Sequence, residues 1–186
     1  DLTIGEQNET NNNATLNISV LWVNLTFPLN NTYTNNENTT LNFTTRDYTN
    51  GSVNYTVYID GSSYSNSSTG DGNATLTNVT LSEGARTIII QATDTLGRKK
   101  NSTPLLRIYD ATPPTPNFET LNGTFFNDTT PEVLFNFTDA LSSLINYTLY
   151  VDAVNDSNGT VSVDTSTAVN LSSLSEGVYN LDRKST

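Results

Sequence analysis

The sequence contains no cysteine, no histidine and no methionine. Without cysteine the chain forms no disulfide, and without cysteine or histidine it lacks the ligands of typical zinc sites. The same absences exclude cysteine nucleophiles and every catalytic triad that depends on histidine. No stretch of these residues has the pattern of a signal peptide, which we expect to have been removed from the chain, and no apolar run approaches the roughly 18 residues that mark a membrane-spanning helix.

Charge is also scarce, because charged residues make up 15% of the chain and the net charge is −11. With only 8 basic residues, nucleic acid is not an expected partner. The 19 acidic residues are spread along the chain, mostly where turns would end strands, and capping of turns is their ordinary role there. We therefore predict no enzymatic activity, no metal site and no cofactor.

Small polar residues are abundant: 32 Thr, 18 Ser and 27 Asn. Twenty asparagines begin the pattern Asn-x-Ser/Thr, the acceptor sequence (sequon) for N-linked glycosylation, whereas random placement would give about 7. We expect many of them to carry covalent glycans, which places the protein outside the cell. The twenty acceptors are Asn8, Asn13, Asn17, Asn24, Asn30, Asn38, Asn42, Asn50, Asn54, Asn66, Asn73, Asn78, Asn101, Asn122, Asn127, Asn136, Asn146, Asn155, Asn158 and Asn170.

Some sequons have the pattern of a half-buried strand. In a strand, residues i and i+2 share one face and residue i+1 points to the other. A sequon with a bulky apolar middle residue therefore predicts a strand that buries this residue and turns its Asn and its Ser or Thr to solvent. Seven sequons are of this kind, those at Asn17, Asn24, Asn42, Asn54, Asn78, Asn136 and Asn146.

The chain is a tandem repeat with a period of about 93 residues. NYTVYID at 54–60 returns as NYTLYVD at 146–152, and LSEG at 81–84 returns at 174–177. Two shorter matches keep the same order and offset. Since four matches in the same order lie 92 to 94 residues apart, the 186 residues correspond to two copies of one unit.

Each copy consists of short alternating segments separated by clusters of Asn, Gly, Ser and Asp, and no segment has the helical period. About seven short strands in such a length are typical of an immunoglobulin-like β-sandwich. We therefore predict an all-β fold of two tandem immunoglobulin-like β-sandwich domains, at 23–110 and 117–186, with a Pro-rich linker at 111–116. The strands expected in the first domain are 25–29, 39–45, 53–60, 73–80, 86–93 and 103–109.

The two copies are shifted by one strand. After LSEG the first copy continues for 26 residues and the second for nine, so the second domain is expected to lack its last strand. At the other end, residues 1–22 form an N-terminal tail. In it, Leu16, Ile18, Val20 and Trp22 alternate with other residues, as in an extension strand with one apolar face.

An open sandwich edge exposes unpaired backbone groups. We therefore predict that the N-terminal strand completes the incomplete second domain of a neighbouring copy by donor-strand complementation, with Leu16, Ile18, Val20 and Trp22 as the inserted side chains. Donor and acceptor lie at opposite ends of the chain, so such contacts would propagate into a filament. The same ends would arise if the chain were a fragment of a longer array, and this alternative stays open.

The segments NLTFPLNNTYT, NFTTRD, NYTVYIDG, LSEG and ATDTLG together resemble the immunoglobulin-like repeats of archaeal surface proteins. Such repeats occur in S-layer glycoproteins and in donor-strand-linked extracellular filaments such as the threads of Sulfolobales. The resemblance implies dense N-glycosylation and an N-terminal strand inserted in the next subunit.

Our leading hypothesis is a structural subunit of a heavily N-glycosylated extracellular filament, polymerised head-to-tail with copies of itself. The alternative is an S-layer or adhesin-stalk repeat with a surface-binding role, whose partners would be cell-surface glycans or other cells. For that role Tyr48 and Tyr64 are candidates for a sugar platform, whereas Trp22 fits better as an inserted side chain.

Overall fold

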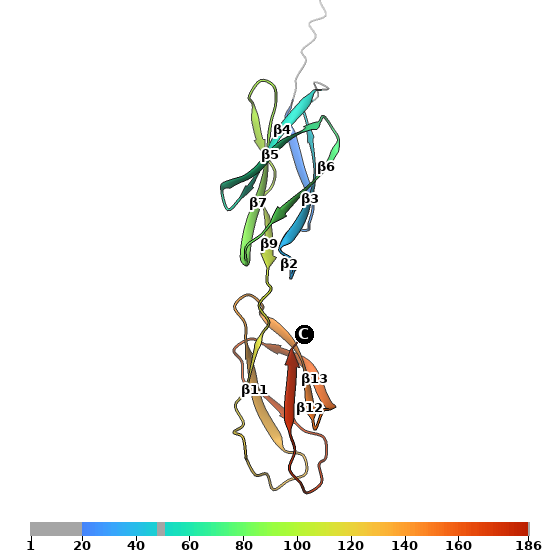
Figure 1. Cartoon of the computed structure of the whole chain (residues 1–186), viewed down its shortest axis with the longest axis vertical. Coiled ribbons are helices and arrows are strands. Elements are labelled where there is room, and N and C mark those ends of the chain that lie inside the picture. Colours follow the sequence, from blue (N-terminus) through green and yellow to red (C-terminus); the bar gives the residue numbers. More distant parts are fainter. Residues whose placement is uncertain (1–19, 48–50, 186) are drawn as a thin grey trace, which may run out of the picture. The chain divides into compact units, whose positions relative to one another are not determined.

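The computed structural model describes residues 20–47 and 51–185. Every helix or strand assigned within these ranges is a β-strand, and the fifteen strands form two separate sets of sheets (Figure 1). The predicted fold, all-β with tandem β-sandwich domains, is therefore confirmed.

The first sandwich contains strands β1 to β9. One sheet has the order β1-β3-β6, with bounds Trp22–Phe27, Asn38–Arg46 and Ala74–Thr80. The other sheet has the order β2-β9-β7-β4-β5, with β8 paired to β7. Its bounds are β2 Thr32–Thr34, β4 Ser52–Ile59, β5 Ser62–Gly70, β7 Gly84–Thr93, β8 Lys99–Asn101 and β9 Leu105–Tyr109.

Alternation builds the core between these two sheets. Every second residue of β3 from Thr39 to Thr45 is buried, and the residues between them face outward or are half-buried. Phe43 is fully buried, and its ring packs edge-on against Tyr55 with 4.8 Å between the centroids. From β7, Ile88 and Ile90 enter the same core.

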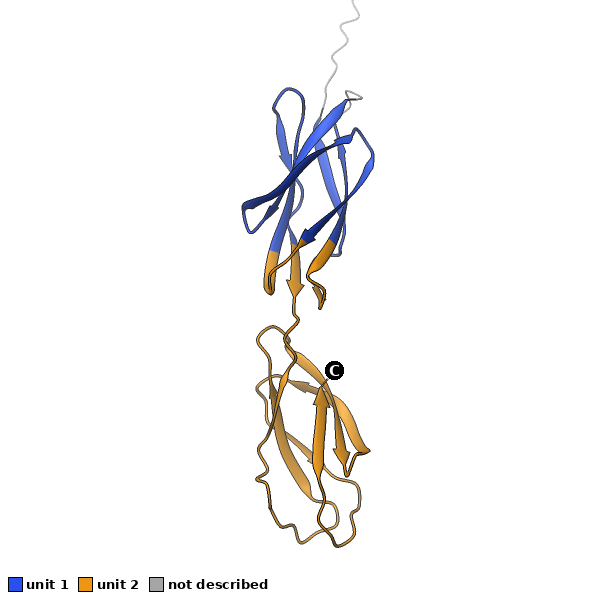
Figure 2. Cartoon of the chain, viewed as in Figure 1, with its two compact units in different colours: residues 1–30, 40–79, 87–105 blue, residues 31–39, 80–86, 106–186 orange. Residues whose placement is uncertain are grey.

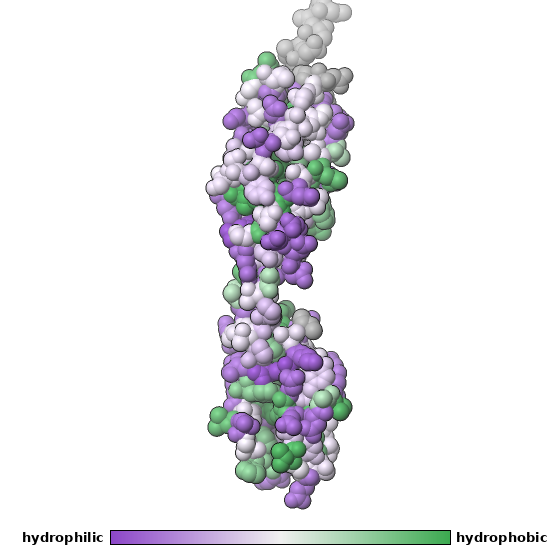
Figure 3. Space-filling view, in the orientation of Figure 1, coloured by the Kyte–Doolittle hydropathy of each residue, from purple (hydrophilic) through white to green (hydrophobic). Residues whose placement is uncertain are grey.

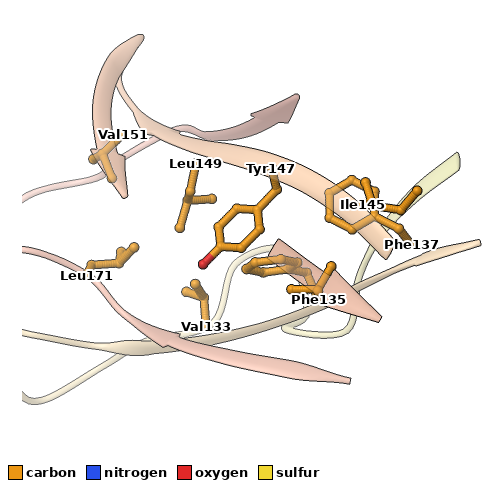
Figure 4. Close-up of a cluster of buried hydrophobic side chains, with 9 residues drawn as sticks. Val133, Phe135, Phe137, Ile145, Tyr147, Leu149, Val151 and Leu171 are labelled. Carbon is orange, nitrogen blue, oxygen red and sulfur yellow. The ribbon is translucent and has the colours of Figure 1, made fainter. Parts of the chain in front are cut away.

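The second sandwich repeats this plan with fewer strands. One sheet has the order β10-β11-β14 and the other the order β13-β12-β15. Figure 4 shows Tyr147 among the apolar side chains of its core, where its ring meets Phe135 at 5.0 Å between centroids. The bounds are β10 Thr115–Phe118, β11 Glu132–Thr138, β12 Leu144–Val151, β13 Val154–Ser162, β14 Thr167–Asn170 and β15 Leu181–Ser185.

Strand β5, like the short strands β2 and β8, was missing from the strands predicted for the first domain; its counterpart in the second domain is β13. The sequences of β5 and β13, SSYSNSSTG and VNDSNGTVS, have no regular apolar alternation. They are strands because tight turns pair them with β4 and β12. The turn residues Asp60 and Gly61 both have positive φ, so the Asp-Gly pair at this position was the signal that could have predicted the first hairpin.

The chain divides into two compact units, one made of residues 1–30, 40–79 and 87–105 and the other of residues 31–39, 80–86 and 106–186 (Figure 2). The paired residues of β2 and β9 fall in the second of these units, but the strand order places both strands in one sheet of the first sandwich. The expected linker 111–116 overlaps β10, which begins at Thr115, and the expected tail 1–22 overlaps β1, which begins at Trp22. The exact domain boundaries stay a prediction.

The absence of a counterpart to the last strand of the first copy, β9, is visible in the sheets of the second. β12 pairs with β15 through Val151 and Leu181, just as β4 pairs with β7 through Ile59 and Ile88. In the first sandwich β9 lies on the other side of β7. Within residues 20–47 and 51–185, no strand pairs with that side of β15.

Candidate functional site: the outer faces of the sheets

The strand sequons turn their middle residues inward, as the alternation predicts. Among the six that the structure describes, five middle residues are buried: Phe43, Tyr55, Val79, Phe137 and Tyr147. The sixth, Leu25, is half-buried at the rim of its sheet, and the sequon at Asn17 lies outside the described residues. These strands therefore use one tripeptide both to fill the core and to present an Asn on the surface.

The sequon asparagines that the structure describes are accessible. Sixteen of the twenty are described; fourteen are exposed and two, Asn42 and Asn136, are half-buried. The remaining four, Asn8, Asn13, Asn17 and Asn50, lie outside the described residues. Since a glycan is attached through the side-chain nitrogen, an outward Asn on a sheet face can carry one without disturbing the core.

Hydroxyl groups on neighbouring strands orient several of these amides. Thr40 Oγ1 donates a hydrogen bond to Asn78 Oδ1 at 2.7 Å, and Thr80 Oγ1 donates one to Asn38 Oδ1 at 3.0 Å. Both bonds use the amide oxygen. The amide nitrogen Nδ2, which N-glycosylation modifies, takes no part in either bond.

Asn136 is held differently from the other sequon asparagines. Its Nδ2 donates to Glu119 Oε1 at 2.7 Å, and its Oδ1 is buried with no hydrogen-bond partner. A glycan on Nδ2 would displace the Glu119 carboxylate from this contact. Of the described sequons in strands, Asn136 is therefore the one whose folded geometry suits a glycan least.

The rest of the surface is polar and without a large apolar patch on the face that Figure 3 shows, where hydrophobic residues lie in small separate groups. Lys99, Lys100 and Lys184 are exposed. Tyr64 is exposed, whereas Tyr48 lies outside the described residues, so the suggested sugar platform of Tyr48 and Tyr64 stays a prediction.

Two of the four proposed donor side chains can be placed. Val20 and Trp22 are exposed, by 57% and 43%, while Leu21 and Val23 between and beside them are buried in the first sandwich. The apolar face that the sequence pattern predicted, represented here by Val20 and Trp22, therefore does not pack into the core of the first sandwich. Leu16 and Ile18 lie outside the described residues, and the insertion itself stays a prediction.

The free edge of β15 carries charges on both faces. Asp182 and Lys184 point outward, and Arg183 points inward. The guanidinium carbon of Arg183 lies 3.7 Å from the centroid of the Phe118 ring, and burial lowers the pKa of Arg183 although Asp182 acts in the opposite direction. In the first copy this inward position is the fully buried Ile90. An inward charge on an edge strand is a known protection against further strand pairing.

Several aspartates at strand ends cap turns, as expected. Asp94 Oδ1 accepts hydrogen bonds from the backbone N–H groups of Leu96 and Arg98, and its Oδ2 pairs with the Arg98 side chain. Burial alone would raise the pKa of Asp94, but these bonds outweigh it, so its pKa lies below its ordinary value. Asp60 and Asp152 accept bonds from Thr87 N and Asn180 N at equivalent turns, both at 2.8 Å.

The described residues contain no group of three or more carboxylates that could hold a metal ion. No helix in residues 20–47 and 51–185 is long and apolar enough to cross a membrane.

No protein-family model and no curated protein matches this chain. Solved structures with a similar strand arrangement include fibronectin(III)-like modules of CbhA from Clostridium thermocellum, at 14% identity over 88% of this chain and 85% of that one, with a TM-score of 0.45. A 1.5-MDa bacterial ice-binding adhesin gives 11% identity over 84% of this chain and 55% of that one, with a TM-score of 0.43.

The BSP domain of a biofilm-associated protein gives 16% identity over 83% of this chain and a quarter of that one (25%), with a TM-score of 0.32. These scores describe a distant likeness of β-sandwich modules. Nothing about the function of this chain follows from them.

Proposed function

We propose that this chain is a non-catalytic, N-glycosylated β-sandwich repeat that forms a structural part of an extracellular surface protein, such as an adhesin stalk or an S-layer. The observation that carries the proposal is the orientation of the sequons. None of the sixteen described sequon asparagines is buried, while five strand sequons place their middle residue in a core.

A structural role agrees with the rest of the described chain. The carboxylates of Asp60, Asp94 and Asp152 are engaged in turns, and the cores are filled with aliphatic and aromatic side chains. Such a module acts as a structural spacer and catalyses no reaction. Glycans on its sheet faces would hinder proteases and would block lateral association of sheets, which matters for a protein exposed to the medium.

Fractionation of the organism that encodes the chain tests this proposal. Antibodies against the recombinant chain should detect it on intact cells or in the medium, and its tryptic peptides should carry glycans on sequon asparagines. Recovery of the chain only from cytosol, with unmodified sequon peptides, would overturn the proposal.

A second candidate is the filament subunit joined by donor strands. The free edge of β15 and the exposed Val20 and Trp22 favour it. The inward Arg183 weighs against it, because an inserted strand would have to pack beside a guanidinium where the first copy has Ile90. For this reason we place the surface repeat first.

Sedimentation of the purified chain separates the two candidates. If donor strands join the copies, Val20→Asp should abolish assemblies and leave the first sandwich folded, whereas Leu96→Asp, a change at an exposed residue far along the sequence, should not. A wild-type chain that stays monomeric at high concentration would contradict the filament and leave the surface repeat intact.

A further inference from the structure

Eight of the sixteen described sequons lie in antiparallel pairs on neighbouring strands. In the pair formed by residues 54–56 and 66–68, Asn54 lies opposite Ser68 and Asn66 lies opposite Thr56. Each Asn thus faces the hydroxyl residue of the other sequon. The second sandwich repeats this register between β12 and β13, where residues 146–148 lie opposite 158–160.

Two further pairs lie on the sheet β1-β3-β6. The two hydroxyl bonds between residues 38–40 of β3 and 78–80 of β6 show the same reciprocal arrangement. Between β1 and β3, Asn24 lies opposite Thr44. A bulge at Thr26 alters the other half of this pair, and the Thr26 hydroxyl donates to the backbone oxygen of Asn42 at 3.0 Å.

The paired sequons are fitted to each other inside the sandwich as well. Each pair places at least one middle residue in a core: Phe43, Tyr55, Val79 or Tyr147. Opposite Tyr147 stands Gly159, where a Cβ atom would lie only 3.0 Å from Tyr147 Cε1. The glycine of the sequon Asn158-Gly159-Thr160 therefore leaves room for the ring that its partner sequon buries.

The pairs occupy the long edges of the sheets. Each pair joins an edge strand, β1, β5, β6 or β13, to its inner neighbour (Figure 1). These four edge strands have 6, 9, 7 and 9 residues. The other strands at the borders of the described sheets, β2, β8, β10, β14 and β15, have only 3 to 5 residues and carry no such pair.

Long exposed edges are the ones that invite pairing with another chain, whereas short edges and charged edges are already protected. We propose that each sequon pair is a double N-glycosylation site whose two glycans together shield a long sheet edge. The inference rests on the proposed function, because it needs a chain that meets the glycosylation machinery. Beyond the proposed function, the inference specifies which sequons act together and which sheet edges their glycans protect.

The geometry allows both glycans at once. In such a register the two asparagines are diagonal neighbours on the same face, with about 7–8 Å between their Cα atoms. The donor is an oligosaccharide linked through phosphate to a lipid. Transfer forms a bond between Asn Nδ2 and C1 of the first sugar and breaks the bond between C1 and the phosphate oxygen; the amide loses one proton and the lipid phosphate leaves.

The amide oxygen is unchanged by this transfer. It can therefore still accept the hydroxyl of the opposite sequon, as Asn146 Oδ1 accepts Thr160 Oγ1 at 2.8 Å. The hydroxyls of Thr40, Thr80 and Thr160 thus have a second role in the folded chain, which is to fix the amide of the partner sequon.

The test uses the full chain secreted through a eukaryotic secretory pathway, with glycan occupancy measured by mass spectrometry of its peptides. We expect Asn54 and Asn66 each to be occupied in more than half of the molecules, which requires double occupancy, and occupancy of Asn54 to be unchanged in Asn66→Gln. A rise at Asn54 when Asn66 is removed would show mutual exclusion and would overturn the inference.

The edge function has its own matched comparison. The double variant Asn54→Gln/Asn66→Gln should lose soluble monomer at high concentration by at least about twofold in light scattering. The control Asn122→Gln/Asn127→Gln removes two exposed sequons outside strands and should behave as wild type. Equal behaviour of the two variants would overturn the inference.

Occupancy also separates the two proposals. If Asn122 and Asn127 carry glycans and the paired sites do not, the pairing inference fails and the glycosylated repeat stands. If every sequon is empty, both fail.

Discussion

Truncation of Phe43 should destabilise the first sandwich and leave the second unchanged. Phe43 is the middle residue of the sequon Asn42-Phe43-Thr44, is fully buried, and packs edge-on against Tyr55 at an interplanar angle of 71°. Phe43→Ala removes this contact and leaves a cavity, which costs about 3–5 kcal/mol in a well-packed core. A domain of this size has a total stability of roughly 4–13 kcal/mol.

The chain offers a natural assay for this prediction, because Trp22 is its single tryptophan and lies in β1, paired with Arg46 of β3. Tryptophan fluorescence during urea unfolding therefore reports on the first sandwich alone. At a slope of about 2 kcal/mol per molar urea, Phe43→Ala should lower the midpoint by about 2 M. Phe43→Leu, a milder change, should cost about 1 kcal/mol and keeps the test readable if the alanine variant does not fold.

Two controls make the prediction specific. Asn42→Gln changes the outward neighbour and should alter the free energy of unfolding by less than about 0.5 kcal/mol. Phe135→Ala empties the core of the second sandwich and should leave the Trp22 transition in place. Equal destabilisation by Asn42→Gln and Phe43→Ala would refute this account, in which each sandwich has its own core filled by the middle residues of strand sequons. A shift by Phe135→Ala of the urea midpoint measured with Trp22 fluorescence would also refute it.

Two further predictions concern single contacts. Gly159→Val should force the Tyr147 ring off Phe135 and destabilise the second sandwich by about 1–3 kcal/mol in far-ultraviolet circular dichroism, with an unchanged Trp22 transition; a neutral result would contradict the close fit. Because the folded pKa of Asp94 is lowered, its contribution to stability is present above the ordinary carboxylate pKa of about 4 and is lost as the pH falls through the lower folded value. Asp94→Asn should therefore reduce the loss of stability of the first sandwich at acidic pH, measured as the urea midpoint of Trp22 fluorescence at several pH values. An unchanged pH dependence would contradict this role.

The half-buried strands were predictable because their residues alternate strictly. In NFT and NYT the aromatic ring can only be buried if Asn and Thr face outward, and the structure has this arrangement at Phe43 and Tyr147. The fold class and the shift between the copies also follow from pattern and period. These features are predictable because burial of one strand face requires a local alternation of apolar and polar residues, and the sequence contains that alternation.

Other features depend on contacts that no local pattern contains. Strand β5 has no apolar face and exists because β4 lies beside it, so alternation could not predict it. The sequon pairs depend on strand register, which fixes Asn54 opposite Ser68 only once the hairpin has formed. The inward Arg183 was equally hidden, because its surroundings come from Phe118 on another sheet.

The central claim is that the outward asparagines of the strands carry glycans on a protein of the cell surface. Its most direct test is glycopeptide mass spectrometry of the chain recovered from the envelope and the medium of the organism that encodes it. The account predicts glycans on the strand sequons, with Asn54 and Asn146 among them and Asn136 occupied least. Unmodified asparagines at all sixteen described sequons would contradict it.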